Sequence, residues 1–354
     1  MNVPADTVTV PMRVLPPRRR LLLLSAAMLG VVAACSPGSV APEQSPDTAA
    51  QQDVPTATAP SPSPTPSPSP SPSPPAIPAP YEPEANEVYP NAKRLAGRVA
   101  QLLTTYEQGT TVEEVVAGVA PDAAYVEELT EAAAPLVRAG VWSRGSVVYP
   151  QLGGVLSDRV SVMVVTRQEL GTGSEVTDVV TRTLDVRLRL DGEEWVLDRV
   201  ASIGGAPVDG DVELPAVAQE VLTDDRISLP DSARWDIQRG EVDPALLTLM
   251  RDLAARVPYE VVVLSSGHPF EVFGPEVQSN HTKGRAVDIH LLDRDLVIDQ
   301  QDEGSPAHEV VQWLYDRPEV SEVGSPWALD GYGGRSFTDV VHADHIHVGV
   351  RAGG

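Results

Sequence analysis

Residues 279–290 read SNHTKGRAVDIH and place His281 seven residues before Asp288. Histidine and carboxylate together, without cysteine, are ligands typical of a zinc site of intermediate hardness. Gly284 allows the backbone between the two residues to turn without a Cβ clash, and Ala286 leaves room near a metal. The stretch therefore predicts two ligands of one ion and requires a third from elsewhere in the chain.

The end of the chain supplies the candidate third ligand. Residues 342–349 read HADHIHVG, and because side chains two apart share one face of a strand, His345 and His347 should point the same way. Three protein ligands leave a tetrahedral zinc with one open position, which is typical of catalytic sites. Asp288 also shares a strand face with His290, so His290 is a rival ligand.

Taken together, the two stretches resemble the zinc metallopeptidases grouped with lysostaphin, the D-alanyl-D-alanine metallopeptidases and the hedgehog signalling domain. The resemblance extends over about residues 215–354 and rests on the pattern Ser279-x-His281-x-x-Gly284-x-Ala286-x-Asp288 followed by His345-x-His347. In that family the first histidine, the aspartate and the last histidine bind zinc. The resemblance thus implies a zinc site formed by His281, Asp288 and His347.

The resemblance also implies a catalytic base, for which there are two candidates. Some family members use the first histidine of the last motif, here His345, and others use an acidic residue three positions before the last ligand, here Asp344. Zinc lowers the pKa of its bound water to about 7 and polarises the scissile carbonyl, while the base passes a proton to the leaving amine. The sequence leaves both candidates open.

One departure from the family concerns substrate binding. Many members carry Ser-Gly-Tyr-Arg after the first strand, and that arginine can bind the substrate carboxylate or the developing oxyanion. Here residues 265–270 read SSGHPF, so Pro269 stands in its place. The candidate substrate-binding residues are Ser279, His268 and Arg285, with Lys283 as a further replacement for the arginine.

The resemblance implies a hydrolase of peptidoglycan, acting on stem peptides or cross-bridges as a D-Ala-D-Ala carboxypeptidase or endopeptidase. Pro269 favours an alternative, a non-catalytic, zinc-containing lipoprotein that binds or scaffolds the cell wall. A third reading is a zinc hydrolase of an unrelated amide. Serine chemistry is disfavoured because no Gly-x-Ser-x-Gly or Ser-x-x-Lys segment lies near the histidines.

Residues 1–35 have the pattern of a lipoprotein signal peptide. Arginines at positions 18–20 precede an apolar run that ends in VAAC, which resembles a bacterial lipobox with Cys35 as the lipidated residue. The apolar run is shorter than the ~20 residues that span a bilayer. Cys35 is the only cysteine, so no intramolecular disulfide can form. We therefore expect a lipid anchor in the cell membrane and an extracytoplasmic chain facing the cell wall.

The composition after the signal peptide predicts a spacer. Residues 36–87 are rich in Pro, Ser, Ala and Thr and cannot form a core, so they predict a disordered linker.

The charge of the whole chain bears on its partners. The chain has 26 Lys plus Arg against 50 Asp plus Glu, a formal net charge of −24, which disfavours nucleic acid as a partner. The expected partners are peptidoglycan peptides and, through the lipid, the membrane.

Two α+β segments follow, an accessory domain at residues 88–210 and a metallopeptidase-like domain at residues 214–354. Periodicity predicts helices at 91–108, 121–138, 244–256 and 306–315, and strands at 159–165, 180–190, 194–200, 259–265 and 345–350. Asp191-Gly192 is a hairpin-turn signal. Helices followed by an antiparallel sheet resemble the cone-shaped fold of nuclear-transport-factor-like domains, which suits an accessory role.

Overall fold

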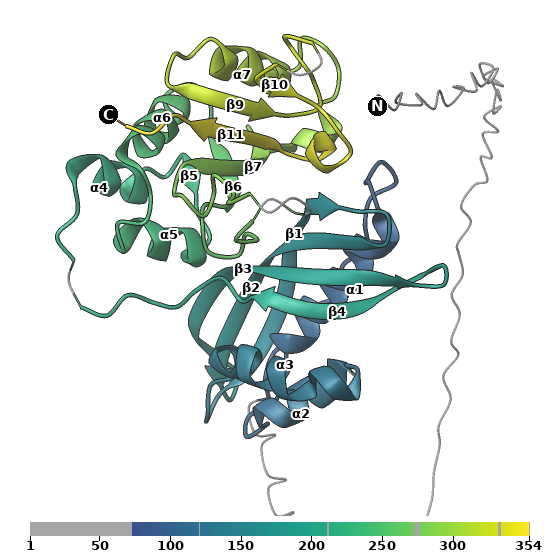
Figure 1. The fold of residues 1–354 in the computed structure, drawn as a ribbon. Helices are drawn as coiled ribbons and strands as arrows, with labels where there is room; N and C mark the ends of the chain where they lie inside the picture. Colours follow the sequence, from purple (N-terminus) through teal and green to yellow (C-terminus); the bar gives the residue numbers. More distant parts are fainter. Residues whose placement is uncertain are drawn as a thin grey trace, which may run out of the picture. The chain divides into compact units, whose positions relative to one another are not determined.

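The fold is α+β, as the sequence predicts, with a four-stranded antiparallel sheet and a seven-stranded mixed sheet (Figure 1). The computed structural model describes residues 73–119, 121–210, 212–271, 273, 277–331 and 334–353, which all belong to one compact unit. The predicted signal peptide, Cys35 and linker residues 36–72 lie outside the described residues. Within the described part, no helix combines the length and apolarity that a membrane span needs.

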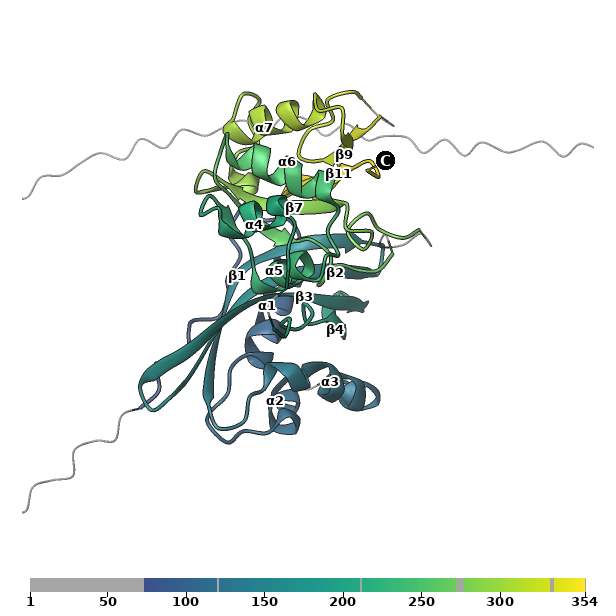
Figure 2. The same cartoon turned by 90° about the vertical axis from the view of Figure 1, so that its left-hand side faces the viewer.

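The N-terminal sheet runs in the order β1-β2-β3-β4. Its strands are β1 (Trp142–Val155), β2 (Arg159–Thr172), β3 (Glu175–Asp191) and β4 (Glu194–Ser202). The helices before it are α1 (Pro90–Leu103), α2 (Val112–Val119) and α3 (Val126–Ala133), with short 3-10 turns η1 (Ala123–Tyr125) and η2 (Ala134–Leu136). Helix α1 packs against all four strands, and α2 and α3 lie together beside it (Figure 2).

Both faces of the N-terminal sheet are buried along β2. Val162 and Val164 belong to the core that α1 and α3 cover, because alternate side chains of a strand share a face. The residues between them, Met163 and Val165, face the other way and pack on Val262 and Val263 of β6 (Tyr259–Val263). The N-terminal sheet is therefore held against the C-terminal part of the chain by apolar contacts.

The C-terminal sheet runs in the order β10-β9-β11-β7-β6-β5, with β8 paired to β7. Its other strands are β5 (Ile227–Ser228), β7 (Ala286–Leu292), β8 (Asp295–Leu296), β9 (Val320–Gly324), β10 (Ser336–Phe337) and β11 (Ile346–Val350). Its helices are α4 (Ala216–Thr223), α5 (Asp231–Gln238), α6 (Pro244–Ala254) and α7 (Pro306–Tyr315), with the turns η3 (Val297–Asp299) and η4 (Val341–Ala343). The order brings the last strand of the chain, β11, to the centre beside β7.

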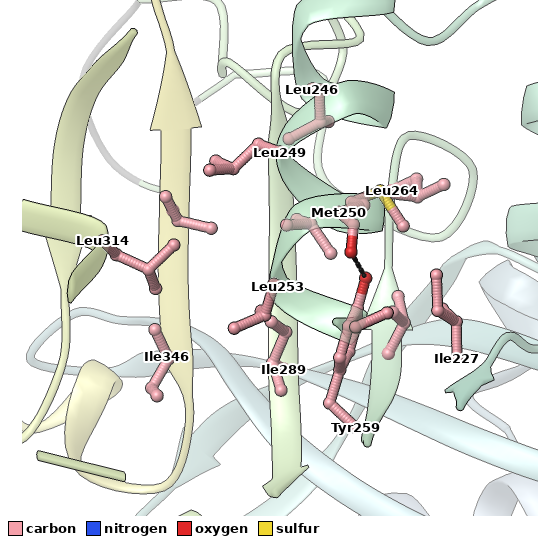
Figure 3. Close-up of a cluster of buried hydrophobic side chains, with 14 of the residues drawn as sticks. Ile227, Leu246, Leu249, Met250, Leu253, Tyr259, Leu264, Ile289, Leu314 and Ile346 are labelled. Atoms are coloured by element: carbon pink, nitrogen blue, oxygen red, sulfur yellow. Dashed lines mark hydrogen bonds between the residues drawn. The ribbon is translucent and has the colours of Figure 1, made fainter. Parts of the chain in front are cut away.

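A single apolar core supports β7 and β11. Leu246, Leu249 and Leu253 recur at helical spacing on α6 and pack with Ile289 of β7 and Ile346 of β11 (Figure 3). All five side chains are at most 2% exposed. The strands that carry the ligand candidates are thus fixed from the face opposite the site.

The end of the predicted linker contacts the N-terminal sheet. The carbonyl of Pro75 accepts a hydrogen bond from Arg144 Nε at 2.7 Å, and that of Pro78 accepts one from Gln101 Nε2 at 3.0 Å. Glu87, 7% exposed, forms an ion pair with Lys93. Residues 73–87 therefore lie against the folded unit, although their composition predicts only a spacer.

Several elements differ from those that periodicity predicts. The expected helix at 121–138 consists of η1, α3 and η2, with Pro135 in η2, where a proline cannot continue an α-helix. The helix expected at 91–108 ends earlier, at Leu103. Strands β1 and β9 carry no clear period and are not among the predicted elements. Helix α2 is not among them either, although Val112, Val115, Val116 and Val119 recur at helical spacing. By contrast, α7 spans the predicted residues 306–315.

Candidate metal centre

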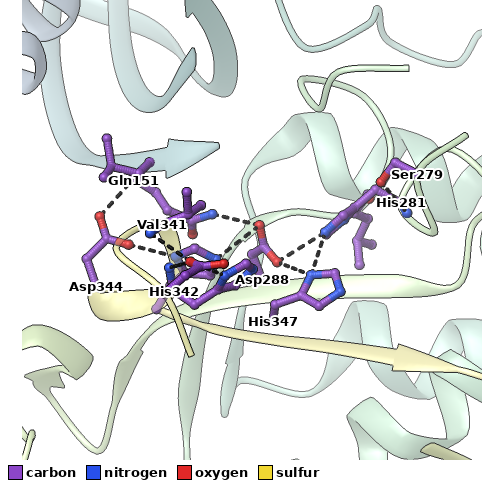
Figure 4. A network of polar contacts seen from close by, with 12 residues as sticks. Gln151, Ser279, His281, Asp288, Val341, His342, Asp344 and His347 are labelled. Atoms are coloured by element: carbon purple, nitrogen blue, oxygen red, sulfur yellow. Dashed lines mark hydrogen bonds and ion pairs between the residues drawn. The ribbon is translucent and has the colours of Figure 1, made fainter. Parts of the chain in front are cut away.

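Two imidazoles and one carboxylate converge at the centre of the C-terminal sheet (Figure 4). His281 Nε2 lies 3.1 Å from Asp288 Oδ1, His347 Nδ1 lies 2.9 Å from the same oxygen, and the two nitrogens are 3.1 Å apart. All three residues are buried. Ligand atoms around a tetrahedral zinc, with bonds of about 2.0–2.1 Å, are separated by about 3.3 Å. The group is therefore compatible with a bound metal ion.

The sheet register explains how two of these residues meet. Asp288 on β7 and His347 on β11 are partners in an antiparallel pair, so their side chains leave the sheet side by side. His281 comes from the turn before β7, which is closed by a hydrogen bond from Gly284 N to the His281 carbonyl. Gly284 has φ +69°, and a Cβ there would lie 1.9 Å from the Glu241 carbonyl oxygen. Only glycine fits this turn.

The remaining ring nitrogens fix which atoms face the centre. His281 Nδ1 donates to the Leu264 carbonyl at 2.7 Å, which leaves the Nε2 lone pair toward Asp288. His347 Nε2 donates to Glu322 Oε1 at 3.1 Å, which leaves Nδ1 toward the same carboxylate. Outer hydrogen bonds of this kind orient metal-binding histidines. Three acceptor atoms face one another, and a cation satisfies all of them.

The charges around His347 favour a positive group at this position. Burial lowers the pKa of His347, but its contacts with Asp288 and Glu322 outweigh burial and raise the pKa to about 10. Burial also raises the pKa of Asp288, yet the neighbouring histidines hold that pKa well below its ordinary value. Without a metal, a proton on His347 Nδ1 supplies the positive charge, so metal and proton compete for the same place.

His268 forms a second grouping with His281 and Asp288, whose ligand atoms lie within 4.8 Å of one another. The His268 ring is stacked on His281, with centroids 4.1 Å apart and planes at 16°. Ring nitrogens bind metals in the plane of the ring, so parallel stacked rings do not converge on one ion. His347, tilted by 57° to His281, has the better geometry. The ring of His347 therefore fits a shared ion with His281 and Asp288 better than the ring of His268 does.

The two candidate bases have different surroundings. His345 Nδ1 donates to Asp344 Oδ1 at 2.6 Å, and His345 Nε2 lies 3.8 Å from Asp288 Oδ2. Asp344 is fully buried, and its Oδ2 contacts Lys93 Nζ at 2.6 Å and the Leu152 amide at 3.1 Å. His345 lines the cavity beside the candidate metal centre, whereas Asp344 does not.

A cavity of about 370 Å³ opens onto the candidate ligands. Its polar lining includes Ser279, Asn280, Lys283, Glu322, Asp339 and His342, and its apolar lining includes Leu152, Met163, Phe337 and Val341. Of the predicted substrate-binding residues, Ser279, His268 and Lys283 line the cavity. Arg285 does not, and its Nε lies 3.9 Å from Asp243 Oδ2.

His290, the rival ligand, lies apart from the converging atoms. Its ring is stacked on Tyr149 with centroids 4.8 Å apart, and its Nε2 is 3.6 Å from Glu260. Burial lowers the pKa of His290 to about 4, so the ring is neutral. The structure thus places His290 in the contact between the two sheets.

Three further residues touch the site without any sequence signal that marks them. Glu322 comes from β9, which has no clear strand period, and orients His347. Lys93 and Gln151 come from the N-terminal segment and contact Asp344 and Asp288. Their positions depend on how the two sheets pack, which no local pattern reports.

Comparison of the chain with family models, with curated proteins and with solved structures gave no match.

Proposed function

We propose that this chain is a zinc-dependent metallopeptidase that hydrolyses peptide bonds in peptidoglycan stem peptides or cross-bridges. The observation that carries the proposal is the meeting of His281 Nε2, Asp288 Oδ1 and His347 Nδ1 within 3.1 Å of one another beside a cavity. The same three positions correspond to the zinc ligands of the D-alanyl-D-alanine metallopeptidase pattern. The C-terminal sheet is then a peptidase-like domain, and the N-terminal helices and sheet a cone-like accessory part.

The donor set favours zinc. Two imidazole nitrogens and one carboxylate oxygen, with no cysteine, match the ligands of catalytic zinc sites, which keep one position open. A bound zinc ion supplies Lewis-acid chemistry to a peptide carbonyl and to water. His281, Asp288 and His347 would hold it, and Glu322 and the Leu264 carbonyl fix the two ring orientations.

His345 is the proposed general base. Its Nδ1 proton is held by Asp344, so its Nε2 lone pair is free to take a proton from the attacking water and to return it to the leaving amine. The Asp344 charge stabilises the imidazolium that forms meanwhile, as a carboxylate does for the histidine of a catalytic triad. Asp344 itself is a positioning residue in this proposal, because it does not line the cavity.

The cavity lining suits a small peptide end. Leu152, Met163 and Phe337 offer apolar contacts to methyl side chains such as those of D-alanine. Lys283 lines the same cavity and can bind a terminal carboxylate, which compensates for Pro269 at the position of the family arginine. The lipid at Cys35 and the proline-rich spacer would place this cavity in the cell wall.

The test measures zinc content and peptide release from purified muropeptides by mass spectrometry, which also reports the bond that is cleaved. We expect one bound zinc and release of D-alanine or of a cross-bridge product, and loss of both in His281→Ala. Equal release by His281→Ala and by the wild-type protein would refute the proposal.

Pro269 supports a second candidate, a zinc-containing protein that binds or scaffolds the cell wall without cleaving it. Its expected result is zinc binding and sedimentation with intact sacculi, with no product from muropeptides. Measurable hydrolysis in the same assay excludes this candidate.

A further inference from the structure

One side chain of the N-terminal sheet reaches the candidate metal centre. Gln151, on β1, is completely buried, and its Nε2 donates to Asp288 Oδ2 at 2.6 Å (Figure 4). The two residues are 137 positions apart in the chain. Gln151 therefore contacts a proposed zinc ligand from a different sheet.

This contact divides the two oxygens of Asp288 between separate partners. Oδ1 faces His281 Nε2 and His347 Nδ1, while Oδ2 accepts from Gln151. The hydrogen bond at Oδ2 opposes rotation of the carboxylate about the Cβ–Cγ bond of Asp288, which favours the orientation with Oδ1 toward the two histidines. Hydrogen bonds that fix ligand carboxylates in this way tune metal affinity.

The buried position of Gln151 does not stabilise the fold through all of its polar atoms. Its Oε1 is buried and has no hydrogen-bond partner among the described residues. A buried acceptor without a partner destabilises the folded state. Register shifts in β1 at residues 147–149 and 152–154 flank Gln151 and Leu152, and such bulges re-aim side chains. The irregular strand thus directs Gln151 Nε2 to Asp288 at the candidate metal centre, which is the one side-chain hydrogen bond that this residue forms among the described residues.

Asp344 is held from the same side by two groups. Strand β1 is an edge strand, and the free amide of Leu152 donates to Asp344 Oδ2. Lys93 of α1, which is 0% exposed, contacts the same oxygen at 2.6 Å and also pairs with Glu87. Because a buried charge needs a partner, Lys93 keeps the Asp344 carboxylate in place under His345.

We propose that the N-terminal sheet and α1 complete the active centre, with Gln151 positioning Asp288 and Lys93 positioning Asp344. This inference rests on the proposed peptidase function. It assigns residues 73–210 a part in the reaction rather than a role as a separate accessory module. The chain would then need both sheets to form one working site.

The first test is Gln151→Met in the full-length chain, with Gln168→Met as the matched control. Gln168 is a buried glutamine of β2 that binds the Leu136 carbonyl and Ser143 Oγ, neither of which belongs to the site. Zinc affinity is measured by competition with a chelator, and Co²⁺ is used as a spectroscopic probe of ligand geometry. We expect Gln151→Met to weaken zinc binding about 10–100-fold and to change the Co²⁺ spectrum, while Gln168→Met changes neither.

The second test compares Lys93→Met with Lys93→Arg. Since Lys93 acts on Asp344 and not on a metal ligand, Lys93→Met should lower kcat about tenfold or more and leave KM and zinc affinity near wild type. Lys93→Arg, which keeps the charge, should recover part of the lost kcat. Circular dichroism confirms that each variant is folded, and Gln151→Asn, too short to reach Asp288, replaces Gln151→Met if that variant unfolds.

The outcomes separate this inference from the proposed function. Wild-type protein that binds no zinc refutes the function. Wild-type protein that binds zinc, together with a folded Gln151 variant of unchanged zinc affinity and Co²⁺ spectrum, refutes the role of Gln151. A folded Lys93→Met variant with the kcat of the wild-type protein refutes the role of Lys93, and so does a folded Lys93→Arg variant that recovers none of the kcat lost in a folded Lys93→Met variant.

Discussion

His347 and Asp288 stand directly opposite each other on β11 and β7, with His347 Nδ1 2.9 Å from Asp288 Oδ1. These strands come from segments separated by 59 positions, and their antiparallel pairing alone brings the two groups together. A shift of one residue in this register would turn one side chain to the opposite face of the sheet. The register of β7 and β11 is therefore the main determinant of the candidate metal centre.

Gly284→Ala should destabilise the protein and weaken metal binding. A side chain at this position needs a left-handed backbone, at a cost of about 1–3 kcal/mol, and its Cβ would also meet the Glu241 carbonyl oxygen. Gly192→Ala is the control, because Gly192 has a similar φ of +66° but no atom within 4 Å of the added Cβ. Urea unfolding should show a larger decrease in the free energy of unfolding for Gly284→Ala than for Gly192→Ala. Equal decreases would mean that the backbone near Gly284 moves to accommodate the added Cβ.

Zinc affinity should rise with pH over the range 6 to 8. The pKa of His347 is raised to about 10 in the metal-free protein, so binding must displace a proton throughout this range. One displaced proton changes the apparent affinity about tenfold per pH unit. Calorimetry in buffers of different ionisation heat measures the proton release directly. Affinity that does not change with pH would contradict protonation of His347.

Glu322→Gln should remove part of the acid sensitivity of the metal-free protein. The hydrogen bond from His347 lowers the pKa of Glu322 to about 2. A depressed pKa of this kind stabilises the fold above the ordinary value near 4.5, and the contribution is lost as the pH falls toward 2. Urea unfolding in chelator at pH 5 and pH 3 should show a smaller difference for Glu322→Gln than for wild type. If the difference in the free energy of unfolding between pH 5 and pH 3 is the same in both proteins, Glu322 does not contribute to the acid sensitivity.

Removing the metal should lower the melting temperature. A ligand that binds only the folded state at 100 times its Kd stabilises that state by roughly 2.7 kcal/mol. Zinc should therefore raise the Tm of wild type and have no effect on His281→Ala. His308→Gln is the matched control, because His308 packs at a tilt against Trp327 and does not line the cavity. This variant should keep the full shift in Tm.

Local patterns predicted several parts of this fold well. The apolar period of residues 306–315 predicts helix α7, and the alternation of apolar and polar residues near Val162 and Leu184 predicts strands β2 and β3. These patterns arise because one face of each element must be buried. Strand β1 was missed because Pro150 and the glycines at 153 and 154 interrupt its pattern. An edge strand tolerates a proline, but the sequence does not say which strand is the edge.

The residue types of the candidate site are readable from local sequence, namely His281, Asp288 and a pair of histidines two positions apart. The folded chain was needed to show that His345 lines the cavity while Asp344 does not, and that Gln151, Lys93 and Glu322 contact these residues. The reason is physical: ligand spacing within a turn or a strand follows from local geometry, whereas sheet order and the contact between two sheets depend on burial across the whole chain.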